Sequence, residues 1–150
     1  MSQWTHCCGL IRIDAIPEID GTTIMKVSDR FGNKCNYDDD KKTWDACTVP
    51  CGSEGSLHYE IKKTGNEHEV SWGVVYIWGD LRDYEDYRAI YEWIKKACEP
   101  FMIRSCAVKI DVEYHGEYLV TDVFGVNKTT IELIEISHAK NDPENEDAGL

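Results

Sequence analysis

Apolar and polar residues alternate at the start of the chain. Over residues 4–16 every second position is small or apolar, and the opposite positions become polar toward Asp14. This period of two predicts a β-strand with one face toward a core. A turn over 17–21 and a short helix over 22–31 should follow, because an apolar stripe at helical spacing ends at Gly32.

A long polar segment, 33–56, comes next and is predicted to be a loop. Two strands should follow, 57–63 and 68–78, with a turn at 64–67 that predicts a β-hairpin. Apolar residues occupy both faces of the second strand, which is typical of a strand in the centre of a sheet. Residues 79–82 are predicted to form a tight turn in which the chain leaves this strand.

The clearest helix is predicted from Asp83 to Glu99. Asp83 is a suitable N-cap, with Asp86 three residues later in a position like that of a capping box. Aromatic and aliphatic side chains then recur at helical spacing on one stripe. Two lysines suit the negative end of the helix dipole, and Pro100 ends the helix.

Alternation returns after this helix. Strands are predicted over 103–114, 118–124 and 131–136, joined by short turns in a meander. The order of elements predicts an α+β fold: a mainly antiparallel sheet with one long amphipathic helix on one face, and a ferredoxin-like arrangement as the nearest simple topology. We expect one domain over 1–137 and an acidic, frayed tail over 138–150.

Composition narrows the class of protein. The 150 residues fit one domain, and the formal net charge is −12. Such a chain repels phosphate backbones and anionic membranes, and it is attracted to basic surfaces, including the grooves of nucleic-acid-binding proteins. No apolar run is long enough to span a bilayer, and the first residues do not have the features of a secretory signal. We therefore expect a cytosolic protein whose seven cysteines are reduced thiols.

Four residues could hold a metal ion. Cys47 and Cys51 have the C-x3-C spacing of one zinc knuckle, with Cys35 upstream and His58 downstream. A second knuckle is absent and the outer spacings match no common zinc module. Ordinary loop thiols are the alternative, and we expect no cofactor unless it is zinc.

Two groups of charged residues are candidate partner-binding sites. The first is an acidic turn that could also hold a hard cation or simply be solvated. The second is a charged corner before the main helix, whose simpler explanation is helix capping and local salt bridges. The first group is Asp38, Asp39 and Asp40, and the second is Asp80, Arg82, Asp83, Glu85 and Asp86.

Known catalytic motifs are missing from the sequence. Neither phosphate-binding glycine pattern occurs, and no H-E-x-x-H zinc motif is present. The segment 52–56 is not a G-x-S-x-G nucleophile elbow. No histidine shares a motif with a cysteine or serine, so we expect that the protein is not an enzyme.

Several short segments resemble a family of small hypothetical proteins from phages and prophages of Gram-positive bacteria. The resemblance spans residues 2–112, whereas the loop 33–51 and the segment after Tyr114 are particular to this chain. It implies a phage accessory protein, and small acidic phage proteins often disarm host defences. The segments that carry the resemblance are Trp4-Thr5-His6, Gly9 to Asp14, Gly52 to Leu57, Gly79 to Tyr84, and Trp93 to Lys96.

Three functions follow as hypotheses. The first is an inhibitor of the anti-CRISPR type, whose acidic surface covers the basic nucleic-acid-binding site of a host defence protein in the bacterial cytosol. The second is a protein that sequesters a signalling nucleotide, with Trp72, Tyr76, Arg82 and Arg104 around its ligand. The third is a small metal-dependent enzyme. The sequence leaves the oligomeric state open.

Overall fold

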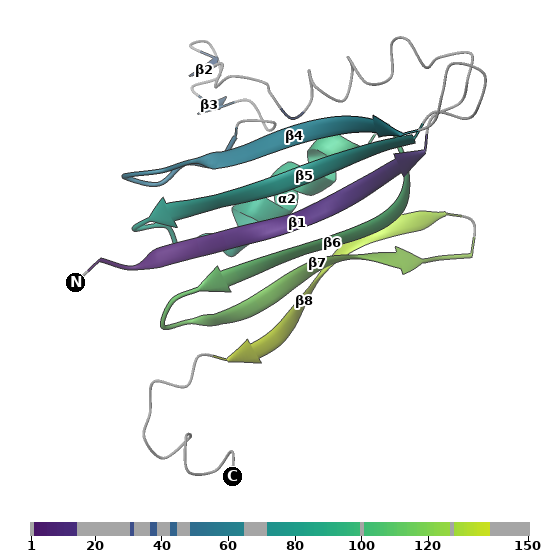
Figure 1. Cartoon of the computed structure of the whole chain (residues 1–150). Helices are drawn as coiled ribbons and strands as arrows, with labels where there is room; N and C mark the ends of the chain where they lie inside the picture. Colours follow the sequence, from purple (N-terminus) through teal and green to yellow (C-terminus); the bar gives the residue numbers. More distant parts are fainter. Residues whose placement is uncertain are drawn as a thin grey trace.

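A six-stranded antiparallel sheet dominates the protein, in the strand order β4-β5-β1-β6-β7-β8 (Figure 1). The structure is a computed structural model, and it describes residues 2–14, 31, 37–38, 43–44, 49–64, 72–99, 101–126 and 128–138. The strands of this sheet are β1 (Trp4–Asp14), β4 (Leu57–Thr64), β5 (Trp72–Arg82), β6 (Met102–Val112), β7 (Gly116–Phe124) and β8 (Thr129–His138). Two short strands, β2 (Tyr37–Asp38) and β3 (Thr43–Trp44), pair separately.

The first strand of the chain lies in the middle of the sheet. β1 pairs antiparallel with β5 on one side, where Trp4 aligns with Arg82, and with β6 on the other, where Thr5 aligns with Val112. Because both neighbours are antiparallel to β1, β5 and β6 run parallel to each other. Parallel strands need a crossover connection, and helix α2 (Tyr87–Cys98) provides it.

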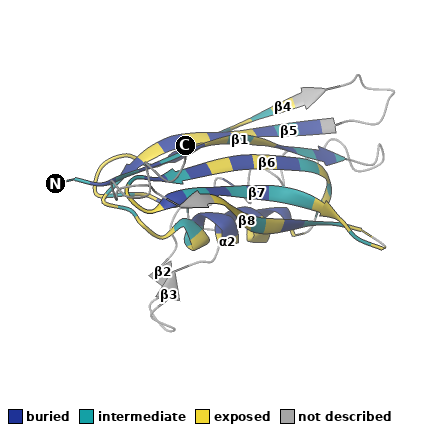
Figure 2. Ribbon diagram, turned by 90° about the horizontal axis from the view of Figure 1, so that it is seen from below, coloured by how far each residue is buried: buried dark blue, intermediate teal, exposed yellow. Residues whose placement is uncertain are grey.

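Helix α2 covers one face of the sheet (Figures 1 and 2). Asp86 caps its first turn, since an Asp86 carboxylate oxygen accepts from the Ala89 backbone N–H at 3.1 Å. Lys95 and Lys96 occupy the last turn, as predicted. The side chains of one helix face are buried against the sheet: Ile90, Tyr91, Trp93, Ile94, Ala97 and Cys98.

The core lies between α2 and the inward face of the sheet. Trp93 is the largest fully buried side chain, and its ring meets that of Phe31 edge to face at 5.4 Å. Of the helix predicted over 22–31, only Phe31 is among the described residues, and it is helical and buried. Each buried side chain of this kind contributes roughly 1.5–3 kcal/mol of hydrophobic stabilisation. The inward-facing residues of the strands include Ile11, Ile13, Val75, Ile77, Leu81, Val108, Ile110, Val112 and Val120.

Gly9 lets the two central strands approach each other closely. A Cβ at this position would lie 2.1 Å from the carbonyl oxygen of Ala107 and 2.4 Å from the Cα of Val108. Both atoms belong to the backbone of β6, so neither can rotate away as a side chain would. A larger residue at this position would force β1 and β6 apart.

The sequence predicted most of these elements correctly. The α+β class, the mainly antiparallel sheet, the hairpin of β4 and β5 and the meander of β6, β7 and β8 are confirmed. The inward face predicted for the strand at 103–114 is also confirmed, because Cys106, Val108, Ile110 and Val112 are buried. The tail predicted at 138–150 lies outside the described residues beyond His138.

Three local predictions were wrong. Residues 79–82 continue β5 instead of leaving the sheet. Arg82 pairs with Trp4 of β1, and its backbone N–H donates a hydrogen bond to the Glu54 carbonyl in the loop before β4. The helix begins at Tyr87, since Asp83 has a φ of 55° and cannot take the extended conformation of an N-cap. The predicted loop 33–56 contains β2 and β3, which are too short to give an alternating pattern.

No helix of the described segments has both the length and the apolar character that crossing a membrane requires.

Candidate functional site

The face of the sheet opposite α2 carries no helix among the described residues, and we call it the open face (Figure 2). Three apolar side chains lie at its centre with much of their surface exposed: Leu10 at 39%, Tyr76 at 39% and Trp78 at 42%. The strand register places Leu10 beside Tyr76, and Cys8 beside Trp78. Neighbouring strands thus bring these side chains into one apolar centre.

This exposure differs from what the sequence indicated for β5. The strand is internal in the sheet, as predicted, with β4 on one side and β1 on the other. Its apolar residues on both faces are usually a sign of burial on both faces, but the face with Tyr76 and Trp78 remains open. Large contiguous apolar patches on a protein surface often mark interaction sites. The open face is therefore the candidate binding surface.

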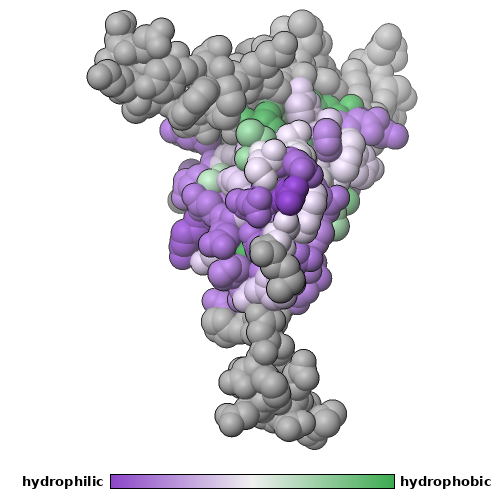
Figure 3. Space-filling model, turned by 90° about the vertical axis from the view of Figure 1, so that its left-hand side faces the viewer, coloured by the Kyte–Doolittle hydropathy of each residue, from purple (hydrophilic) through white to green (hydrophobic). Residues whose placement is uncertain are grey.

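Charge differs between the two ends of the open face. The end nearest the N-terminus carries four carboxylates, which we call the acidic end, and Lys109 lies among them with its Nζ 3.0 Å from Glu117. Hydrophilic residues (purple) gather over this end of the molecule in Figure 3. Basic residues, Arg12 and Lys62, lie farther along the strands. The carboxylates of the acidic end are Asp80, Asp111, Glu113 and Glu117.

His6 lies between two carboxylates of the acidic end. Its Nδ1 is 2.6 Å from Asp80 Oδ1, and its Nε2 is 3.3 Å from Glu113 Oε2. The other oxygen of Glu113 accepts from the backbone N–H of Trp4 at 2.9 Å, which fixes that carboxylate. A hollow of about 270 Å³ lies beside the imidazole, and Lys109 contributes to its lining.

These contacts favour the charged form of His6. Hydrogen bonding to Asp80 is the largest cause that raises the pKa of His6 above its ordinary 6.5, and partial burial opposes it. An imidazolium that donates to two carboxylates has no lone pair left to accept a proton. A general base needs such a lone pair. The geometry therefore suits a histidine that holds neighbouring strands together by charge better than one that takes a proton from the nearby thiol of Cys8.

A closely bonded corner adjoins the acidic end. Arg82 Nη1 is 2.5 Å from Glu54 Oε1, and its Nη2 donates to the Ser2 hydroxyl at 2.7 Å. Ser53 donates to Asp83 at 2.9 Å. Backbone hydrogen bonds join the same segments. The Arg82 N–H donates to the Glu54 carbonyl, and the Asp83 N–H donates to the Gln3 carbonyl. Two of the segments singled out in the sequence, Gly52 to Leu57 and Gly79 to Tyr84, therefore meet here with the residues just before Trp4 in one structural joint.

The backbone conformation at position 55 explains why the loop before β4 has glycine there. The φ of Gly55 is +78°, a conformation that residues with a side chain rarely adopt. A Cβ on Gly55 would lie 2.1 Å from the carbonyl oxygen of Asp80. The loop before β4 can therefore lie against the end of β5 only with glycine at this position.

The structure separates the five charged residues predicted as one binding corner. Asp80 lies on the open face with His6, whereas Arg82 and Asp83 are used in the joint with the loop before β4. Glu85 lies 3.4 Å from His115, and Asp86 caps α2. Local structure thus explains four of the five, and Asp80 is the one that meets His6 on the open face.

The predicted acidic turn is described only at Asp38. Its backbone forms part of β2 and pairs with Thr43, whereas Asp39 and Asp40 lie outside the described residues. A role of this turn in partner binding stays a prediction.

The predicted zinc ligands are only partly described. Cys35 and Cys47 lie outside the described residues, so the four-ligand set stays a prediction. Cys51 is exposed and forms a β-bridge with Ser56, and the His58 ring stacks on Trp78 with centroids 5.7 Å apart. Within the described segments, no group of three or more His, Cys, Asp or Glu side chains is arranged to hold a metal ion.

Two buried cysteines are chemically protected. Burial raises the pKa of both the Cys7 and the Cys106 thiols to about 12. A thiol needs its thiolate form to react, so these two side chains serve as small apolar core residues. Cys8, on the opposite face of the same strand as Cys7, is exposed.

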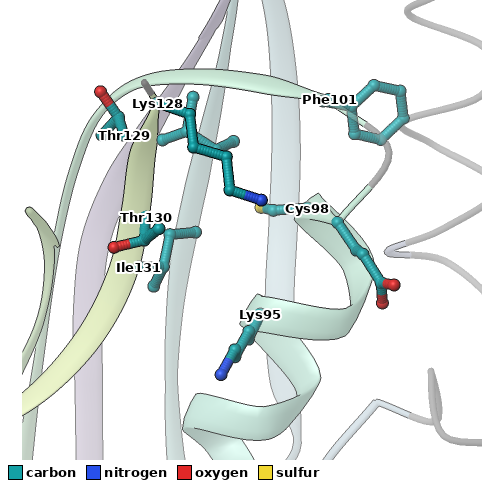
Figure 4. Close-up of a pocket in the computed structure, with 9 residues that line it drawn as sticks. Lys95, Cys98, Phe101, Lys128, Thr129, Thr130 and Ile131 are labelled. Carbon is teal, nitrogen blue, oxygen red and sulfur yellow. The ribbon is translucent and has the colours of Figure 1, made fainter. Parts of the chain in front are cut away.

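A small cavity lies between the end of α2 and the start of β8 (Figure 4). Its volume is about 190 Å³, and Cys98 and Ile131 form part of its apolar floor. Figure 4 shows Lys128 extending toward Cys98, while Lys95 points away from it and lies over the ring of Tyr91. Ligand pockets are usually larger, roughly 300–1,000 Å³, so this cavity could hold only a small group.

The residues predicted around a nucleotide do not meet. Tyr76 lies near the middle of β5, and Arg82 lies at its end and bonds to Glu54 and Ser2. Arg104 lies toward the opposite end of the sheet, where its Nη1 is 3.2 Å from Asp14. The side chain of Trp72 is not among those described.

Most residues of the open face described above were not predicted as site residues: His6, Leu10, Trp78, Lys109, Asp111, Glu113 and Glu117. The alternation in β1 placed His6, Cys8 and Leu10 on one face, but only strand pairing brings β6 beside them. Comparison of the chain with protein-family models, curated proteins and solved structures gives no match.

Proposed function

We propose that the protein acts by binding another protein through its open face. The observation that carries this proposal is the exposed apolar centre of Leu10, Tyr76 and Trp78 on a face that no described helix covers. Aromatic side chains are enriched at the energetic centres of protein interfaces, where they provide large buried areas at low entropic cost. Charged residues around such a centre determine partner and orientation more than affinity.

The charge favours a basic partner. The chain carries a net charge of −12, and the acidic end places four carboxylates beside the apolar centre. A surface of this kind is attracted to a groove that evolved to hold phosphate backbones, and it repels the nucleic acid itself. With the resemblance to phage proteins, this supports a partner among host defence proteins in the bacterial cytosol, with inhibition of the anti-CRISPR type.

We further propose that the fold is of the ferredoxin-like class. The strand order β4-β5-β1-β6, with β1 between two parallel strands that α2 connects, matches the second half of that topology. The first half requires a helix between β1 and β4. The helical conformation of Phe31 and its packing on Trp93 support that helix.

Interference with plasmid transformation tests the inhibitor function directly. Bacteria with an active CRISPR nuclease lose a targeted plasmid, and the wild-type protein should restore transformation. The double variant Tyr76→Ser/Trp78→Ser should not restore it, because both side chains are lost from the apolar centre. Phe124→Ser is the matched control, since Phe124 is 86% exposed and lies at the end of β7.

The outcomes separate the parts of the proposal. If the wild-type protein and Phe124→Ser restore transformation and the double variant does not, the result supports binding through the open face. Equal restoration by the double variant would contradict the role of that face. No restoration by wild type against any nuclease tested would contradict the choice of partner. Binding of the purified nuclease should weaken as salt rises, because charge steers the encounter.

A further inference from the structure

Strand β8 is an edge strand. It pairs with β7 along one side, from Gly116 with His138 to Phe124 with Thr129, and no strand among the described residues pairs with its other side. The ten residues of β8 include no proline, lysine or arginine. Lysine and proline are common means of protecting an edge from pairing with another chain. β8 instead carries two glutamates and a bulge near its end, where Glu117 aligns with Ser137 but Tyr118 aligns with Glu135.

Helix α2 occupies one part of this edge strand. The Tyr91 hydroxyl donates to the Ile131 carbonyl at 3.1 Å, which joins the helix to the first half of β8. The second half, from Glu132 to His138, includes two apolar side chains that are largely exposed, Ile134 at 45% and Ile136 at 50%. Pairing with β7 is regular from Glu132 to Glu135 and a bulge at Ile136 follows, so this half offers a short regular edge with an apolar exterior.

Charge indicates what kind of segment could pair there. Glu132 and Glu135 are exposed on this half of β8, and the sequence beyond it adds Asp142, Glu144, Glu146 and Asp147. Opposite charges on facing strands stabilise a pair, and like charges destabilise it. A second copy of the chain would bring another −12 charge to the same edge, so self-pairing is disfavoured.

We propose that the second half of β8 binds an extended segment of a partner protein, which joins the sheet as an added strand. Glu132 and Glu135 are three residues apart on a regular stretch of β8 and therefore point to opposite faces of the sheet, so the added strand would carry apolar residues with one basic residue on each face. Backbone hydrogen bonds would provide affinity, and the glutamates would select basic side chains. The inference rests on the proposed function only in taking the chain to be a binding protein. It uses a different surface, at the edge of the sheet instead of its open face.

A synthetic peptide tests this site without knowledge of the partner. The probe is a seven-residue peptide of valine with two lysines three positions apart, and its effect is read by hydrogen exchange of the backbone amides of the full chain. We expect the peptide to slow exchange of amides within 132–138 by about tenfold or more, because paired amides are protected from solvent. The same peptide with proline at its centre should protect much less, since proline removes a donor.

Two variants separate this site from the open face. Glu132→Lys/Glu135→Lys should lose the protection, whereas Tyr76→Ser/Trp78→Ser should keep it. Failure of the transformation experiment would then leave this result unaffected. Peptide binding without protection in β8, or equal protection by the same peptide with glutamate in place of lysine, would overturn the proposal. So would a dimer in sedimentation experiments that protects the same amides, because the occupant would then be a second copy.

Discussion

His6 and Asp80 connect β1 with β5 on the open face, with Nδ1 of the imidazole 2.6 Å from Oδ1 of the carboxylate. The pair aligns directly across β1 and β5 in the strand register. Because Glu113 holds the other ring nitrogen, the imidazole is bonded to carboxylates on two sides. The protonation of one side chain is thus connected to the geometry of the acidic end.

Stability should depend on pH through this histidine. The pKa of His6 is raised in the folded protein, so its stabilising contribution is complete below 6.5 and is lost as pH rises through the raised value. Asp80→Asn should return the pKa toward 6.5, because it removes the largest cause of the shift. Titration of the imidazole by NMR measures this directly.

Urea denaturation gives the energetic counterpart. The destabilisation by Asp80→Asn should be greater at about pH 5.5 than at about pH 8.5, where the histidine becomes neutral. The difference should stay below about 1 kcal/mol, because both side chains are partly exposed and solvent screens the pair. An equal effect at both pH values would show that the charge of His6 contributes nothing.

Gly9 and Gly73 form a matched pair for a test of strand packing. Gly9→Ala should destabilise the protein by about 1–3 kcal/mol or more, because its Cβ would overlap the backbone of β6. Gly73→Ala should be neutral or stabilising by up to about 1 kcal/mol, since no atom lies within 4 Å of the added Cβ. Denaturation midpoints of the two variants check this, and equal effects would contradict the close approach at Gly9.

Asp86 should matter for helix stability more than Glu85. Asp86→Ala removes the side-chain acceptor of the Ala89 N–H and should cost about 0.5–2 kcal/mol. Glu85→Ala changes only an exposed contact with His115 and should stay within about 0.5 kcal/mol. Thermal denaturation followed by circular dichroism compares the two. A larger loss for Glu85→Ala would place the helix start elsewhere.

Thiol labelling should distinguish the two faces of β1. At about pH 8 an alkylating reagent should modify Cys8 quickly and Cys7 only on unfolding, because burial raises the pKa of Cys7 to about 12. Cys106 should be protected for the same reason. Fragmentation by mass spectrometry locates the label on the adjacent cysteines. Rapid labelling of Cys7 in folded protein would contradict its burial.

Local patterns were enough to predict the strands and the main helix. The period of two in β6 and the helical stripe in α2 depend only on neighbouring residues, so both could be recognised in the sequence. The start of α2 could not, because Asp83 and Asp86 are equally good caps by residue type. Their conformations are decided by the joint of Arg82 with Glu54 and Ser53.

The open face depended on information that the sequence does not carry locally. Tyr76 and Trp78 have the pattern of buried residues, and their exposure follows from the position of the covering helix on the other face. His6 meets Asp80 and Glu113 across sequence separations of 74 and 107 residues. Charged residues close in sequence, such as Asp80 and Glu85, instead have separate roles.

The central position of β1 has a consequence for biosynthesis. Thr5 aligns with Val112, so β1 leaves the ribosome well before this neighbouring strand is made. At roughly 5–20 residues per second, that interval lasts roughly 5–20 s. A nascent chain that stalls before β6 therefore exposes an incomplete sheet, a form that molecular chaperones protect from aggregation.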